Sequence, residues 1–236
     1  MPNTGADHIV QSYSDELTAL AQLIAEMGGQ VEVAIENGTK SLLKLDRELA
    51  DVTIIADQRI DDMQRRIDEM AVSMIARRQP MASDLRAIVT SIHVASDLER
   101  VGDMAKQLAR RSLKLDGISL QPTFYNGVKN MTALVMRQIS EALNAYSSRN
   151  AAMAIEVCNR DDEVDAMHTS LFRELLTYMM EDPRNITTCT HLLFCAKSLE
   201  RIGDHATNIA ERAYYLQTGK PLSSDVQELQ RTQIKA

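Results

Sequence analysis

The chain has 236 residues and a net charge of −7 at pH 7; 44% of its residues are hydrophobic, 4% are aromatic and none is Trp. This composition excludes an all-β fold, because long strands favour β-branched and aromatic residues. It also excludes non-specific nucleic-acid binding, which needs clustered Lys and Arg. No stretch approaches 18 consecutive apolar residues, and the first residues lack the pattern of a signal peptide. We therefore expect a cytoplasmic all-α protein.

Three interior prolines, Pro80, Pro122 and Pro183, divide the chain into long uninterrupted stretches. Proline is tolerated in the first turn of a helix and breaks a helix elsewhere. Asp46 and Asn150 are further candidates for the residue that caps a helix N-terminus. The sequence therefore predicts six long helices, over residues 10–43, 47–77, 83–115, 122–147, 151–181 and 184–217.

An internal repeat relates the two halves of the chain. The run Leu98–Asp103 (LERVGD) recurs 101 positions later as Leu199–Asp204 (LERIGD). Upstream, the pair Asp57 and Asp61 recurs 104 positions later as Asp161 and Asp165. Landmarks repeated in the same order indicate two copies of one plan. We predict two tandem three-helix bundles, over residues 1–118 and 119–217, followed by a C-terminal tail over 218–236.

The repeated runs place acidic side chains where apolar ones are expected. In the predicted helix 83–115, Glu99 and Asp103 fall on the apolar face, and Glu200 and Asp204 do the same in the helix 184–217. An unpaired buried carboxylate costs several kcal/mol, so a neutralising group is needed. The preceding helices carry Asp57/Asp61 and Asp161/Asp165 at the edges of their apolar stripes. Antiparallel packing would bring four carboxylates together in each half.

Two interpretations of these acids are open. In the first, each group binds one or more metal ions, because oxygen-rich, cysteine-free clusters suit Mg²⁺, Mn²⁺ or iron and, less obviously, zinc. Asn208, four residues after Asp204, is a weaker candidate ligand, and His168 is another. In the second interpretation the acids are solvated and pair with Arg100 and Arg201.

Other features of the sequence favour a protein without catalytic chemistry. Cys158, Cys189 and Cys195 lack metal-binding spacing and are expected to fill the core. No phosphate-binding glycine loop and no nucleophile with an evident base occurs. Gly102 and Gly203 lie between the paired acids, and either close helix packing or room for a bound ion would explain them.

The doubled motif resembles the PhoU family of bacterial phosphate-specific transport accessory proteins. The resemblance includes Arg78–Pro80 before the first copy and the run from Asp204 to Glu211 in the second. It implies two similar three-helix bundles whose Glu/Asp-x-x-x-Asp motifs bind metal, as multinuclear iron clusters or zinc. The motifs here are Glu99/Asp103 and Glu200/Asp204, with Asp57/Asp61 and Asp161/Asp165 as partners.

The resemblance also implies a role. PhoU proteins are negative regulators of the phosphate-starvation response and are thought to link the ATPase of the Pst phosphate transporter to the sensor kinase PhoR. We would then expect a homodimer that associates peripherally with the inner membrane through its partners. Gln107 and Arg110 replace the Asn208 and Glu211 of the second half, which weakens the expectation for the first metal site. A carboxylate-bridged metalloenzyme of unknown substrate and a metal-free structural protein are the alternatives.

Overall fold

The structure is a computed structural model that describes residues 4–115 and 122–223, with side chains from residue 13 in the first helix and from residue 125 in the fourth. Within these ranges the chain is helical and has no strand. The elements are α1 (Thr4–Lys44), α2 (Arg47–Arg78), α3 (Ala82–Lys114), α4 (Pro122–Ser147), α5 (Ala151–Asn159), α6 (Asp161–Glu181), the 3₁₀ turn η1 (Pro183–Asn185) and α7 (Ile186–Thr218).

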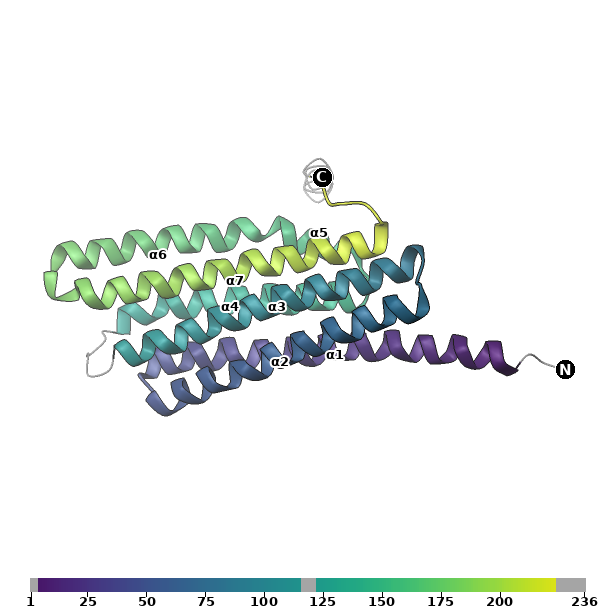
Figure 1. Ribbon diagram of the computed structural model, residues 1–236. Helices are drawn as coiled ribbons and strands as arrows, with labels where there is room; N and C mark the ends of the chain where they lie inside the picture. The colour runs from purple at the N-terminus through teal and green to yellow at the C-terminus, as the bar shows by residue number, and fades with distance from the viewer. Residues whose placement is uncertain (1–3, 116–121, 224–236) are drawn as a thin grey trace.

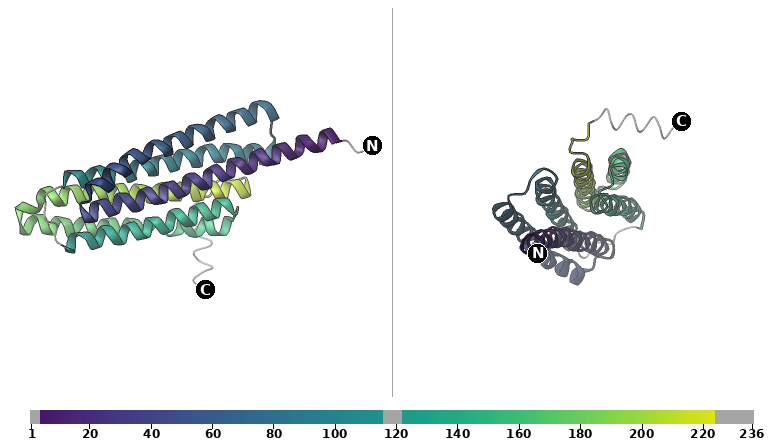
Figure 2. Two further views of the ribbon diagram at one scale, coloured as in Figure 1. Left: turned by 90° about the horizontal axis from the view of Figure 1, so that it is seen from below. Right: turned by 90° about the vertical axis from the view of Figure 1, so that its right-hand side faces the viewer.

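The helices form two bundles that lie side by side along their length (Figures 1 and 2). Helices α1–α3 make the first bundle and α4–α7 the second, which confirms the expected all-α fold of two three-helix bundles. The predicted boundary between residues 118 and 119 lies outside the described residues. In the predicted tail over 218–236, α7 ends at Thr218, and residues 224–236 also lie outside the described residues.

The second bundle departs from the prediction at Arg160. The expected single helix over 151–181 is divided there into α5 and α6, which follow one another along the same side of the bundle (Figure 1). Asp161, Asp162 and Glu163 occupy the first turn of α6, where negative charge favours a new helix N-terminus. The Arg160 guanidinium pairs with Glu141 on α4. The interruption thus places Asp161 at the start of a helix.

The starts of α2, α5 and η1 follow the sequence signals, whereas α3 and α7 begin without a side-chain cap. Asp46 accepts a hydrogen bond from the backbone N–H of Leu49, and Asn150 accepts from those of Ala152 and Met153. These bonds satisfy donors that the first turn of a helix leaves free. Asp182 caps the 3₁₀ turn that Pro183 opens. These caps fix where α2, α5 and η1 begin.

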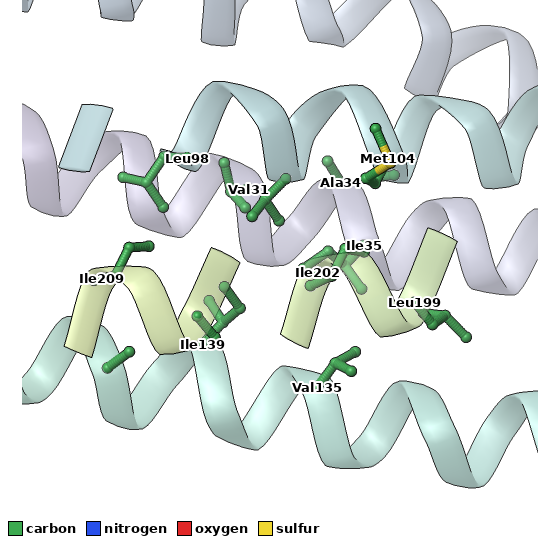
Figure 3. Packing of buried hydrophobic residues seen from close by; sticks show 14 of the residues in the cluster. Val31, Ala34, Ile35, Leu98, Met104, Val135, Ile139, Leu199, Ile202 and Ile209 are labelled. Atoms are coloured by element: carbon green, nitrogen blue, oxygen red, sulfur yellow. The ribbon is translucent and has the colours of Figure 1, made fainter. Parts of the chain in front are cut away.

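The hydrophobic core continues from one bundle into the other through α3 and α7. Figure 3 shows side chains of α1, α3, α4 and α7 meeting there. They are Val31, Ala34 and Ile35 of α1, Leu98 and Met104 of α3, Val135 and Ile139 of α4, and Leu199, Ile202 and Ile209 of α7. A shared core holds the bundles together and fixes the position of the acidic residues on α3 and α7.

Two glycines of α1 provide a matched test of this packing. A Cβ at Gly38 would lie 2.6 Å from the backbone oxygen of Ala105 on α3, whereas a Cβ at Gly29 would meet no atom within 4 Å. Gly38→Ala should lower the free energy of unfolding by about 1–3 kcal/mol because the helices must separate. Gly29→Ala should raise it by about 0.5–1 kcal/mol through helix propensity alone. Urea denaturation measures both, and an equal gain in the two variants would contradict the packing described.

Candidate functional site

The first acid cluster consists of Asp57 and Asp61 on α2 and Glu99 and Asp103 on α3. Asp57 is buried, and the other three are partly buried. Burial raises the pKa of Glu99, and the charges of Asp103, Asp61 and Asp57 raise it further, while Arg100 opposes them. Burial and then Asp57 raise the pKa of Asp61. The four carboxylates therefore lie close enough to repel one another, as the antiparallel arrangement predicts.

A lysine of α3 lies within the first acid cluster. The Lys106 ammonium donates to Asp57 Oδ2 and lies 3.3 Å from Asp103 Oδ1. The hydrogen bond to Asp57 is the main cause that raises the pKa of Lys106. Arg100 adds a looser contact from the outer side, with Nε 3.5 Å from Glu99 Oε2. This cluster thus contains a cation of its own.

The second acid cluster consists of Asp161 and Asp165 on α6 and Glu200 and Asp204 on α7. The neighbouring helices partly shield the exposed Asp204 carboxyl from water, which raises its pKa, and the charges of Glu200, Asp161 and Asp165 raise it further against the opposing charge of Lys197. The same partial loss of water, with Asp161 and Glu200, raises the pKa of Asp165. The structure thus brings together the same four positions in both repeats.

The second acid cluster has no cation at the position of Lys106. The repeat places Thr207 there, and its hydroxyl donates to Asp161 Oδ1 at 3.0 Å. Gln138 of α4 donates to the same oxygen at 3.2 Å. Lys197 pairs with Glu200 from a half-exposed position, 2.7 Å from Oε1. Within the described ranges, Asp165 and Asp204 make no ion pair.

The two acid clusters fit a metal ion to different degrees. In the first, the Lys106 ammonium lies between Asp57 and Asp103 and offsets part of their charge. In the second, Asp165 and Asp204 face the solvent and are destabilised by their acidic neighbours, and carboxylate oxygens are the donors that hard cations take. No three His, Cys, Asp or Glu side chains of residues 4–115 and 122–223 converge on one metal position in the conformation described. The second acid cluster fits a cation by donor chemistry.

Gly102 and Gly203 pack tightly against the neighbouring helix. A Cβ at Gly102 would lie 3.0 Å from Ile60 Cδ1 of α2, and one at Gly203 would lie 3.3 Å from Val164 Cγ1 of α6. Of the two explanations offered by the sequence, close helix packing is the one that these contacts support. The glycines let the acid-bearing helices approach each other.

The weaker candidate ligands take different positions. His168 is partly buried, and its charge lowers the pKa of Asp165, so it lies near the second acid cluster. The Asn208 amide nitrogen instead lies 3.5 Å from Asp97 Oδ1 on α3. Asn208 thus belongs to the contact between the bundles.

Asp97 is a buried acid that the repeat did not reveal. Its Oδ2 accepts from Arg212 Nε at 2.7 Å, and its Oδ1 lies 3.1 Å from His205 Nδ1, both on α7. Burial favours the neutral acid, but the hydrogen bonds from His205 and Arg212 outweigh it and hold the pKa of Asp97 below its ordinary value. The sequence does show one sign of it, because the two repeats differ at this position: the counterpart of Asp97 is Ser198. This charged contact joins the two bundles.

Removing the lysine of the first acid cluster should destabilise the fold. Lys106→Met leaves the buried Asp57 without its counter-ion, so we expect the free energy of unfolding to fall by about 1–3 kcal/mol. Lys197→Met is the matched control, because its ammonium is more exposed and such pairs contribute less than about 1 kcal/mol. Equal losses in chemical denaturation would show that Lys106 does not neutralise a buried charge.

The Asp97 contact should give a pH-dependent stability. A carboxyl whose folded pKa lies below the unfolded value of about 3.9 stabilises the fold above that pH and loses this contribution as pH falls through the folded pKa. Asp97→Asn should therefore cost about 1–3 kcal/mol at pH 7 and progressively less below about pH 4. Asp62→Asn, at an exposed position on α2, is the control with a small effect. Denaturation curves from pH 7 to pH 3 test this, and a cost that persists unchanged at low pH would contradict it.

Comparisons with known proteins agree with the doubled architecture. The family model "PhoU domain" matches twice, over residues 24–112 and 128–213. A protein of Rhizobium meliloti (strain 1021) is 50% identical over 212 residues, 90% of each chain. One of Caulobacter vibrioides (strain NA1000 / CB15N) is 43% identical over 218 residues, 92% of this chain and 95% of the relative. Both are named phosphate-specific transport system accessory protein PhoU homolog.

Solved structures show the same fold. The crystal structure of PhoU from Pseudomonas aeruginosa is 40% identical with a TM-score of 0.84, over 88% of this chain and all of that one. The phosphate transport system regulatory protein PhoU from Streptococcus pneumoniae is 28% identical with a TM-score of 0.82, over 89% of this chain and 99% of its own. With both repeats matched by the family model and close relatives spanning almost the whole chain, this protein belongs to the PhoU family.

Proposed function

We propose that the chain is an accessory protein of a phosphate transport system that represses the phosphate-starvation response when phosphate is plentiful. In this role it works as an adaptor between the transporter ATPase and the sensor kinase PhoR, at the inner face of the inner membrane. The relatives named as transport accessory proteins support the first statement. No described helix has the long, nearly uncharged apolar run that crossing a bilayer requires. The chain acts as a homodimer and needs no catalytic activity for this role.

The observation that carries the proposal is the second acid cluster within this family fold. Asp161, Asp165, Glu200 and Asp204 would hold a metal ion there, one of iron, zinc, manganese or magnesium. The bound ion would supply positive charge that neutralises the carboxylates. Around it, Thr207 and Gln138 hold Asp161 in place through its Oδ1 oxygen. A surface whose charge depends on metal loading suits a protein that presents helix faces to partners.

The proposal predicts a specific pattern of complementation. A strain lacking the gene should show high alkaline phosphatase activity and phosphate uptake in phosphate-rich medium, and the intact gene should restore repression. Glu200→Gln/Asp204→Asn removes the charge of two carboxylates from the cluster open to metal, so we expect repression to be lost. Glu99→Gln/Asp103→Asn makes the matched change in the cluster that already contains the Lys106 ammonium, and repression should largely remain.

The same experiment can contradict the proposal in two ways. Repression that persists in the deletion strain would remove the regulatory role. Full repression by the Glu200→Gln/Asp204→Asn variant, at normal protein abundance, would show that the second acid cluster is not needed for it. Immunoblotting of each strain controls for loss of the protein.

A further inference from the structure

A cationic hollow lies at the C-terminal end of α3. This end of α3 is close to the start of α7, since Arg111 contacts His191 and Phe194. In Figure 1, α3 ends toward the left-hand side. The hollow has a volume of about 480 Å³ and is lined by Gln107, Arg110, Arg111, Leu113 and Lys114. We call it the α3 hollow. Three positive side chains within five residues stand out in a chain whose net charge is −7.

The cations of the α3 hollow have no carboxylate partner in the described part of the chain. Arg111 is instead oriented by neutral groups of α7. Its Nη1 lies 3.4 Å from His191 Nδ1, and its guanidinium lies over the ring of Phe194, 4.2 Å from the centroid. Burial, Arg111 and Lys114 lower the pKa of His191, which keeps the imidazole neutral at pH 7 and able to accept from Arg111. The arginine is thus held in place with its charge uncompensated.

The second repeat contains the same feature in a charge-balanced form. Positions 208, 211, 212 and 215 are the counterparts of 107, 110, 111 and 114, and they line a hollow of about 210 Å³ at the end of α7. There Arg212 donates to Asp97 across the bundle contact at 2.7 Å. In the second repeat, Ser198 occupies the position that corresponds to Asp97. Arg111, the counterpart of Arg212, therefore has no aspartate at the matching position. The second repeat also has Glu211 where the first has Arg110.

Stabilisation of α3 explains the presence of only some of the three cations. Positive side chains in the last turn of a helix interact favourably with its dipole, and this accounts for Arg111 and Lys114. It does not account for Arg110, which precedes the last turn, or for the hollow beside the three cations. An arginine fork with a neighbouring lysine is the donor set that binds the oxygens of phosphate groups.

We propose that the α3 hollow binds a phosphate-class oxyanion through Arg110, Arg111 and Lys114. The anion is either inorganic phosphate or the phosphate of an acidic phospholipid headgroup. It supplies the negative charge that Asp97 and Glu211 supply in the second repeat. The site is separate from the acid clusters, since Arg110 lies roughly 10 Å further along α3 than Asp103.

The test uses the chain after treatment with a chelator, so that phosphate held by a metal at the acid clusters is not measured. Inorganic phosphate is titrated by calorimetry, with chloride as the background anion. Cosedimentation is measured with vesicles of phosphatidylcholine containing phosphatidylglycerol, and with vesicles of phosphatidylcholine alone. Binding of inorganic phosphate identifies the free anion, and binding only to the acidic vesicles identifies the lipid phosphate.

The decisive variant gives the first repeat the residues of the second. Arg110→Glu/Lys114→Tyr changes two exposed positions, so the variant should fold. It should bind at least tenfold more weakly to the probe that the parent chain binds, whether inorganic phosphate or the acidic vesicles. Arg66→Glu/Arg59→Gln makes the same change in charge at exposed positions of α2 and should leave binding within twofold. Circular dichroism confirms that both variants fold. Equal weakening in the two variants, or no binding of either probe to the parent chain, would overturn the proposal.

Discussion

Repulsion among carboxylates at a helix contact is the constraint on which the rest of this structure depends. Each repeat brings two acids of one helix against two of its neighbour, and burial with like charge raises several of their pKa values. Such a contact is stable only when a cation or hydrogen-bond donors offset the charge. The first repeat uses the ammonium of Lys106. The second uses the hydroxyl of Thr207 and the amide of Gln138 at Asp161 and the half-exposed Lys197 at Glu200, and it leaves Asp165 and Asp204 open to solvent.

The two repeats differ again at the contact between α3 and α7. Arg212 is neutralised by Asp97, whereas its counterpart Arg111 rests on Phe194 and His191. The first repeat therefore offsets more of its acidic charge with its own cations and leaves Arg111 without a carboxylate partner, and the second does the reverse. Duplication of one three-helix unit followed by divergence at these few positions explains how two similar repeats acquire different charges. The acid clusters differ in charge between the repeats, and so do the surroundings of Arg111 and Arg212.

The sequence predicted the parts that depend on local patterns. Helix limits followed from Pro80, Pro183 and the caps, and the pairing of acids followed from their spacing on neighbouring helices. Arg160 was missed because a helix interruption without proline or glycine leaves no strong local signal. Lys106 and Asp97 were missed because their partners are set by packing between helices. Both residues lie at positions where the two repeats differ: Thr207 corresponds to Lys106, and Ser198 corresponds to Asp97. Comparing the repeats position by position would have singled them out.

Metal stoichiometry most directly tests the claim that the two acid clusters are inequivalent. Elemental mass spectrometry is run on protein purified without chelator or a histidine tag, for the parent chain and for the paired amide variants of each acid cluster. We expect bound metal that is lost with Glu200→Gln/Asp204→Asn and retained with Glu99→Gln/Asp103→Asn. Equal loss in both variants, or a parent chain that takes up no metal after reconstitution, would contradict this expectation.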